Sequence, residues 1–131
     1  MALDPTDLDD ATLAFLAERH LATLTVIRPD GTPHVTPVGF TWDDERRLAR
    51  VITWTTSKKA RLVAGSQPTP VAVSQVDGGR WLTLEGMATV TDDADACAEG
   101  CRRYAERYRE PKERPDRAVI EIAVTQILGR A

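Results

Sequence analysis

The sequence predicts a mainly β (α+β) protein: a small antiparallel barrel of about six strands with about three helices. Six stretches are rich in β-branched and aromatic residues, and turn signals such as Pro29-Asp30-Gly31 and Asp77-Gly78-Gly79 separate neighbouring stretches. Only three stretches have helical spacing. Strands in consecutive antiparallel order, joined by hairpins and covered by few helices, are typical of a small barrel.

The bulk composition indicates one soluble globular domain over residues 1–131. A hydrophobic fraction of 42% with 28% charged residues excludes fibrous and disordered classes. The net charge of -3 gives no support to nucleic-acid binding, and no apolar run approaches the ~20 residues that cross a bilayer. Because the first residues have no features of a targeting segment, we expect a cytoplasmic protein without nucleic-acid or membrane partners.

The first half of the chain should form one helix and a hairpin. Thr6 is a good N-cap for a helix over residues 7–19, which has an apolar stripe and acidic residues in its first turn. Strands are expected at 21–28 and 33–42. Pro33, Pro37 and Gly39 make the second of these irregular, which is typical either of an edge strand or of backbone that lies close to a ligand.

The second half should contain four strands and two helices. The β pattern covers residues 48–55, 71–76, 80–90 and 118–128, and Gly86 suggests a bulge or a barrel corner. A short helix should start at Ser57 and end near residue 65. A longer one should run from residue 92 or 93 to about 109.

The two cysteines offer little chemistry. Cys97 and Cys101 lie four residues apart in the longer helix, where they share a face but have poor geometry for a disulfide. With no histidine or third cysteine nearby, we expect no metal site.

Residues 49–63 carry the clearest binding signal. A β-rich run ends in the hydroxyls of Thr55, Thr56 and Ser57, followed by the ammonium groups of Lys58 and Lys59 at the predicted helix start. Hydroxyls, ammonium groups and free backbone N–H groups together suit a phosphate. An ordinary capped helix with exposed lysines has the same pattern, so both interpretations stay open at this point.

Four stretches together resemble a known family: LATLTVIRPDGTPHVTPVGF (21–40), RVITWTTSKKARLV (50–63), VAVSQVDGGRWLTLEGMATV (71–90) and RAVIEIAVTQILG (117–129). With the order of elements, they resemble the split β-barrel family of pyridoxamine-phosphate-oxidase-like flavin and deazaflavin proteins. The resemblance covers roughly residues 7–129, and within the family the chain looks most like the F420-dependent reductases. It implies a six-stranded antiparallel split β-barrel that forms a homodimer with two cofactor sites at the subunit interface.

The resemblance also implies which residues bind the cofactor. Ser57, Lys58 and Lys59 would hold its phosphate or the polyglutamate tail. The ribityl chain and ring edge would follow Ile52, Thr53, Trp54, Thr55 and Thr56, while the ring would lie beside His34, Thr36 and Pro37 with a polar contact from Gln75. Some relatives have an arginine where this chain has Ser57, so FMN stands as the alternative to coenzyme F420.

The implied reaction is hydride transfer from the reduced deazaflavin to an electron-poor conjugated acceptor, with biliverdin as the first expectation. Because the cofactor supplies the difficult chemistry, no catalytic triad is expected and none is visible. His34 could donate a proton, although a structural or ring-stacking role is favoured. The alternatives are an FMN-dependent enzyme of the same fold and a non-catalytic protein that stores a cofactor or a tetrapyrrole.

Two further segments have two interpretations each. Arg80 and Trp81 follow a tight turn, where they could wall a planar substrate at the rim of the site, or Trp81 could fill the barrel or the dimer core. Seven basic residues between Arg102 and Arg117 are interleaved with acidic ones, which is typical of a solvated face. The rarer interpretation is a basic rim that receives carboxylates of the substrate or cofactor.

Overall fold

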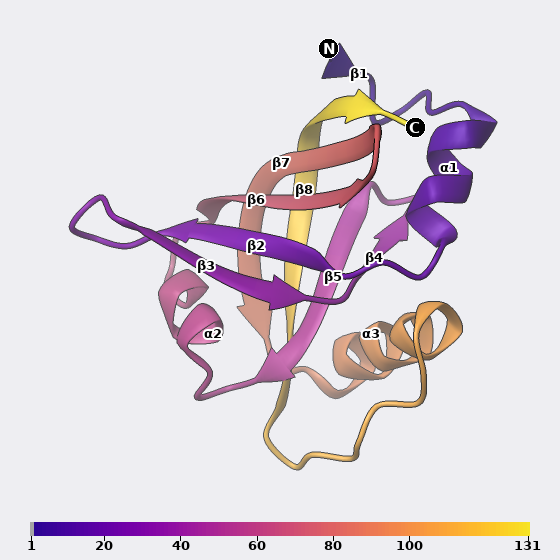
Figure 1. Cartoon of the computed structure of the whole chain (residues 1–131). Helices are drawn as coiled ribbons and strands as arrows, with labels where there is room; N and C mark the ends of the chain where they lie inside the picture. Colours follow the sequence, from indigo (N-terminus) through magenta and orange to yellow (C-terminus); the bar gives the residue numbers. More distant parts are fainter. Residues whose placement is uncertain (1) are drawn as a thin grey trace.

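The computed structural model describes residues 2–131, which form one strongly curled antiparallel sheet with three helices around it (Figure 1). The strand order is β3-β2-β6-β7-β8-β5-β4, and the short β1 pairs with β8. The strands are β1 (Ala2–Leu3), β2 (Ala22–Ile27), β3 (Pro33–Val38), β4 (Phe40–Asp43), β5 (Leu48–Trp54), β6 (Thr69–Asp77), β7 (Arg80–Thr91) and β8 (Arg117–Arg130). The predicted mainly β, antiparallel class is confirmed.

The consecutive strand order expected from the sequence is wrong. β2 lies beside β6, and β5 lies beside β8, so two of the pairings join strands far apart in the chain. The strand count also exceeds six, because the N-terminal β1 adds a pairing with β8 and residues 33–42 form two strands in place of one.

Gly39 divides that stretch and carries the chain from one end of the strand order to the other. β3 and β4 are the two outermost strands of the sheet, so the link between them crosses its open side. A Cβ atom at Gly39 would lie 3.1 Å from ring carbons of both Tyr104 and Tyr108, which explains why glycine suits this close approach. The two edges of the curled sheet are therefore joined by the chain at Gly39 and not by strand pairing. The gap in pairing between β3 on one side and β4 and β5 on the other is called the seam.

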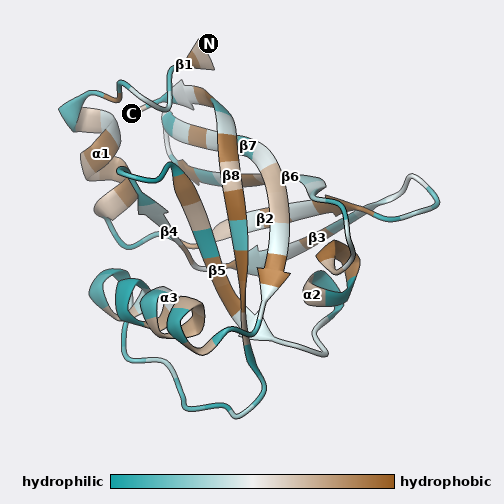
Figure 2. Ribbon diagram, turned by 180° about the vertical axis from the view of Figure 1, so that it is seen from behind, coloured by the Kyte–Doolittle hydropathy of each residue, from teal (hydrophilic) through white to brown (hydrophobic). Residues whose placement is uncertain are grey.

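The inward-facing residues of the strands form the core. Leu24, Val26, Val73, Leu84 and Ile122 are all 0% exposed, as expected for strands that alternate between a buried and an outward face. Figure 2 shows the apolar residues gathered on the strands, whereas α3 is largely hydrophilic. Burial of this apolar area supplies the main favourable free energy of folding.

A bulge at Gly86 bends the long strand pair β7 and β8, as the sequence predicted. The register shifts between Glu85 and Gly86, and a Cβ atom at Gly86 would lie 2.2 Å from the carbonyl oxygen of Ala123. Only glycine fits so close to the neighbouring backbone, so the curl of the sheet depends on this position.

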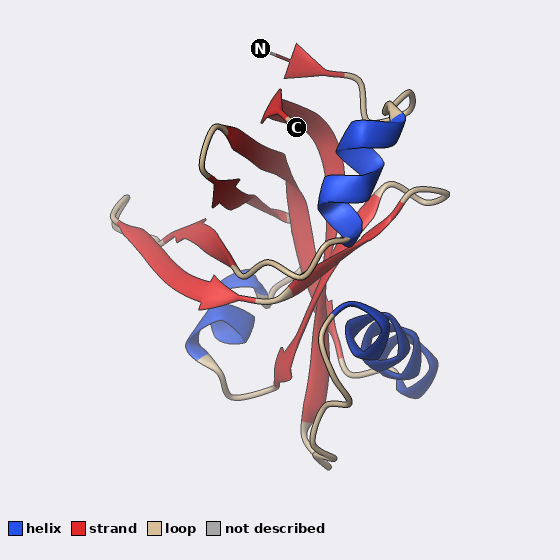
Figure 3. Cartoon of the chain, turned by 45° about the vertical axis from the view of Figure 1, so that its right-hand side comes forward, coloured by secondary structure: helices blue, strands red, loops and turns tan. Residues whose placement is uncertain are grey.

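The helices are α1 (Asp10–Ala17), α2 (Lys58–Val63) and α3 (Ala94–Arg107). Ser57 caps α2, which confirms the predicted start. The predicted start of the first helix is wrong, because Asp9 caps α1 while Thr6 donates to the side chain of Asp4. α2 and α3 lie at one end of the sheet and α1 at the other (Figure 3). No helix in residues 2–131 is long and apolar enough to cross a membrane.

Candidate functional site

The candidate site lies at the seam of the sheet. β4 pairs with β5 only up to Val51, so beyond that residue β5 keeps a ladder with β8 alone, and within the described chain β3 pairs only with β2. Between these two unpaired edges is a cavity of about 300 Å³, lined by Pro37, Val38, Gly39, Val51, Ile52, Lys59, Tyr104, Arg109, Glu110, Pro111, Lys112 and Arg117. Unpaired strand edges present backbone N–H and C=O groups that a ligand can bind.

Lys59 reaches this cavity from the start of α2. Its Nζ lies 5.2 Å from the centre of the Trp54 ring, and burial lowers the pKa of its ammonium group below the ordinary value. α2 has only six residues, so the lysine side chains supply more positive charge here than the helix dipole does. Ser57 is buried, and its oxygen accepts hydrogen bonds from Ala60 N at 3.2 Å and from Thr53 Oγ1 at 2.7 Å.

Two polar side chains on the inner face of β3 lack partners. His34 Nδ1 and Thr36 Oγ1 are buried, and no described atom forms a hydrogen bond with either. The pKa of His34 is lowered from 6.5, mainly by burial and then by the charges of Arg28, Lys58 and Lys59. His34 is therefore neutral near pH 7. Buried polar atoms without partners are costly, and a bound ligand can supply the missing hydrogen bonds.

The predicted cofactor-binding residues fall into three groups. Pro37, Ile52 and Lys59 line the cavity itself, while His34, Thr36, Thr53, Trp54, Thr55, Thr56, Ser57 and Lys58 lie on the same two segments beside it. Gln75 is elsewhere: it is 1% exposed, its Nε2 donates to Phe15 O, and its Oε1 accepts from Arg107.

Arg80 and Trp81 also lie apart from the cavity within one chain. They start β7 close to α1 and the C-terminus (Figure 1). Arg80 donates to Glu18 and Asp77 and covers the Phe15 ring, whereas Trp81 is 37% exposed on the outer face of the sheet.

Residues 108–116, the α3–β8 loop, lie beside β5 and the start of α2. From the sequence, a basic rim was only the rarer of two interpretations of this charged stretch. Arg109, Glu110, Pro111 and Lys112 of this loop form one wall of the cavity. The charged composition of residues 102–117 was visible, but the pairing of β5 with β8 that carries the loop to the seam was not.

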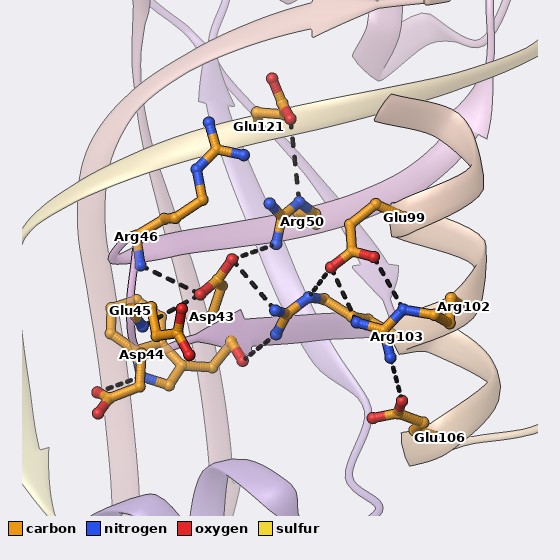
Figure 4. A network of polar contacts seen from close by, with 11 residues as sticks. Asp43, Asp44, Glu45, Arg46, Arg50, Glu99, Arg102, Arg103, Glu106 and Glu121 are labelled. Carbon is orange, nitrogen blue, oxygen red and sulfur yellow. Dashed lines mark hydrogen bonds and ion pairs between the residues drawn. The ribbon is translucent and has the colours of Figure 1, made fainter. Parts of the chain in front are cut away.

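A buried polar network fixes α3, and with it this loop, against β4 and β5 (Figure 4). The Asp43 carboxylate accepts from Arg50 at 2.9 Å and from the backbone N–H groups of Glu45 and Arg46, and Arg103 of α3 lies 3.3 Å from it. Burial would raise the pKa of Asp43, but the Arg46 N–H and the two guanidinium groups outweigh it and hold that pKa below its ordinary value. These contacts tie α3 to the sheet, while Arg50 Nε is buried without a hydrogen-bond partner in the described chain and lies 3.9 Å from Glu121.

Arg107 and Tyr108 extend this support to the end of α3. Arg107 donates to the carbonyl oxygens of Phe40 and Glu18, and the Tyr108 hydroxyl donates to His20 O at 2.6 Å. No sequence signal distinguished Arg107 from its exposed neighbours, because its partners, two backbone oxygens and the Gln75 side chain, are far away in the chain.

A family model described as pyridoxamine 5'-phosphate oxidase matches residues 8–131 of this chain. The chain belongs to the pyridoxamine 5'-phosphate oxidase family. The family resemblance seen in the sequence is thus confirmed over nearly the whole length.

Three proteins of known name or structure are similar to this family member. The chain is 51% identical over 126 residues to a protein named F420H(2)-dependent biliverdin reductase from Mycobacterium tuberculosis (strain CDC 1551 / Oshkosh), covering 96% of this chain and 90% of that one. A solved structure titled F420 reductase has a TM-score of 0.72 and 26% identity, covering 92% of this chain and 98% of that one. The structure of HutZ, the heme storage protein from Vibrio cholerae, has a TM-score of 0.71 at 16% identity, covering 92% and 93%, and that likeness shows the fold alone.

Proposed function

We propose that this chain is an oxidoreductase that uses reduced coenzyme F420 to reduce biliverdin by hydride transfer. The cavity between the unpaired edges of β3 and β5, with Lys59 in its wall, carries this proposal. The 51% identity to an F420H(2)-dependent biliverdin reductase supports both the cofactor and the acceptor.

The residues present fit a deazaflavin cofactor. The unpartnered His34 Nδ1 and Thr36 Oγ1 match a ring edge that carries both donors and acceptors, and Lys59 offers a cation without an acidic partner in residues 2–131. When bound, the reduced cofactor would supply the hydride.

The protein's own contribution is binding and orientation. Lys58 and Lys59 would bind the phosphate, and the edge of Ile52, Thr53 and Trp54 would follow the chain that links phosphate and ring. Thr55 and Thr56 would add hydroxyls there, while Ser57 caps α2 and so holds the lysines in place. Neutral His34, with Thr36 and Pro37, would form the wall beside the ring and exclude water from it.

We also propose that the protein works as a homodimer. The outward positions of β2, β3 and β6 carry no ionisable side chain, and this uncharged face exposes Ile27 (50%), Val35 (54%) and Val76 (69%). Monomers seldom expose a contiguous face of this kind, and a second copy would cover it. Trp81, on the same outer side of the sheet, would then contribute to the partner's site, whereas Arg80 is held by Glu18 and Asp77 beside Phe15.

Titration of the purified protein with F420, and separately with FMN, tests the cofactor by absorbance and fluorescence. We expect F420 to bind and reduced F420 to be oxidised when biliverdin is added. Co-purification of FMN together with a failure to bind F420 would overturn the proposed cofactor. Binding of F420 without reduction of biliverdin would overturn the proposed acceptor.

A further inference from the structure

The α3–β8 loop carries two cations that the proposed cofactor contacts do not use. Arg109 and Lys112 are exposed, and both line the cavity in which Lys59 also takes part. Within residues 2–131 neither side chain forms an ion pair or a hydrogen bond. Two free cations beside a cavity form a natural site for carboxylates.

The neighbouring basic residues are already occupied. Arg102 and Arg103 bind Glu99, Arg114 binds Asp116, and Arg107 donates to backbone carbonyl oxygens and to Gln75. The two basic side chains of this stretch that are free within the described chain both line the cavity. Glu110 lies in the same wall, but Lys59 and Arg117 leave the cavity positive overall.

The loop is anchored so that these cations stay at the seam. Arg117 donates to Thr53 O at 3.2 Å and to the carbonyl oxygen of Lys112, which ties the backbone of Lys112 to the edge of β5. Arg114 stacks on Trp54, with its guanidinium carbon 4.5 Å from the ring centre. A site on a tethered backbone loses less conformational entropy when a ligand binds.

We propose that Arg109 and Lys112 form a carboxylate-binding subsite that receives the two propionate groups of biliverdin. This inference rests on the proposed function. Lys58 and Lys59 of α2 would bind the phosphate of the cofactor, while Arg109 and Lys112 of the α3–β8 loop would bind the carboxylates of biliverdin. Each ligand thus has its own cations, from its own element. The glutamate tail of F420 has the same carboxylate chemistry and is the competing source.

The test compares biliverdin with its dimethyl ester, which has the same conjugated system and no carboxylates. In the double variant Arg109→Gln/Lys112→Gln, the dissociation constant and KM for biliverdin should rise about tenfold, as expected for two exposed ion pairs. Those for the ester should stay unchanged. The matched control is Arg19→Gln/Arg61→Gln, which removes the same charge from exposed positions outside the cavity lining and should change neither constant.

The dissociation constant for F420, measured by its fluorescence, separates the two carboxylate sources. A variant that binds F420 more weakly but distinguishes biliverdin from its ester as wild type does would overturn the subsite, because the cations would then serve the cofactor tail. Equal losses for biliverdin and its ester would overturn it too. If the wild-type protein binds biliverdin but does not reduce it, the proposed function is contradicted. The equilibrium titrations with biliverdin and its ester still test the subsite in that case.

Discussion

At the scale of single residues, Lys59 brings a half-buried ammonium group to the cavity wall, where it would meet the proposed phosphate of the cofactor. Replacing Lys59 by alanine should therefore weaken F420 binding by roughly 1.5–3 kcal/mol, the range for a hydrogen bond to a charged group. Fluorescence titration measures the dissociation constant, with the exposed Arg61→Ala as control. An unchanged constant for Lys59→Ala would remove the proposed phosphate contact.

His34 should make the free protein less stable in acid. Its pKa in the folded state lies below the ordinary 6.5, so the unfolded chain binds the proton more tightly. The stability contribution of neutral His34 is therefore fully present above about pH 6.5 and is lost as the pH falls toward the lowered pKa. Urea unfolding of wild type and His34→Gln between pH 8 and pH 5 measures this. The variant should lose less stability over that interval, and parallel curves would contradict the argument.

Among single residues, local signals in the sequence identified the capping serine and the lysines of α2. Ser57 and Lys59 were predictable because capping and charge depend on neighbours in the chain. Gln75 and Arg107 were not, since a buried hydrogen bond between β6 and α3 depends on the packing of distant elements. Thr53 Oγ1 donates to Ser57, a contact four residues apart that no pattern indicates.

At the scale of elements, glycines mark the places where the sheet bends and where its strands end. The sequence predicted the bulge at Gly86, because a glycine inside a strand pattern usually marks a bulge or a close approach of backbone. It did not separate β3 from β4, because the reason for Gly39 is the closeness of Tyr104 and Tyr108 from α3, which the local pattern does not contain.

Gly86→Ala should destabilise the protein by about 3 kcal/mol, toward the upper end for an overpacked site. The added Cβ would lie 2.2 Å from a backbone oxygen, so the paired strands must separate. Gly79→Ala is the matched control, since nothing lies within 4 Å of its Cβ position and its φ is not positive. Denaturant unfolding compares the two, and similar free energies of unfolding would show that the bulge accommodates a methyl group.

At the scale of the whole molecule, the sequence predicted the class but not the order of the strands. The hairpins β2–β3 and β6–β7 follow from turn residues between neighbouring strands. The pairings β2–β6 and β5–β8 have no local signal, because only burial of the shared inner face selects them. The cavity depends on these distant pairings, so the sequence named only Pro37, Ile52 and Lys59 of its lining as cofactor contacts.

Val35→Glu should convert the proposed dimer to monomers. The substitution places a charge on β3, the outermost strand of the uncharged face, where burial in an interface would leave it without a partner. Sedimentation velocity measures the oligomeric state, and F420 binding should weaken together with dimerisation. Gln67→Glu, in the exposed α2–β6 loop, introduces the same charge elsewhere and should leave the dimer intact. A wild-type monomer that binds F420 tightly would contradict the intersubunit site.

The pairing of β8 also bears on the order of folding. β8 pairs with β7, β5 and β1. About sixty residues of chain separate the end of β5 from the start of β8. Contacts between such distant segments form slowly, because the entropy of closing the loop must be overcome first. On the ribosome, β5 therefore has no partner on that side until residues 117–130 have emerged, and the seam takes shape among the last events of folding.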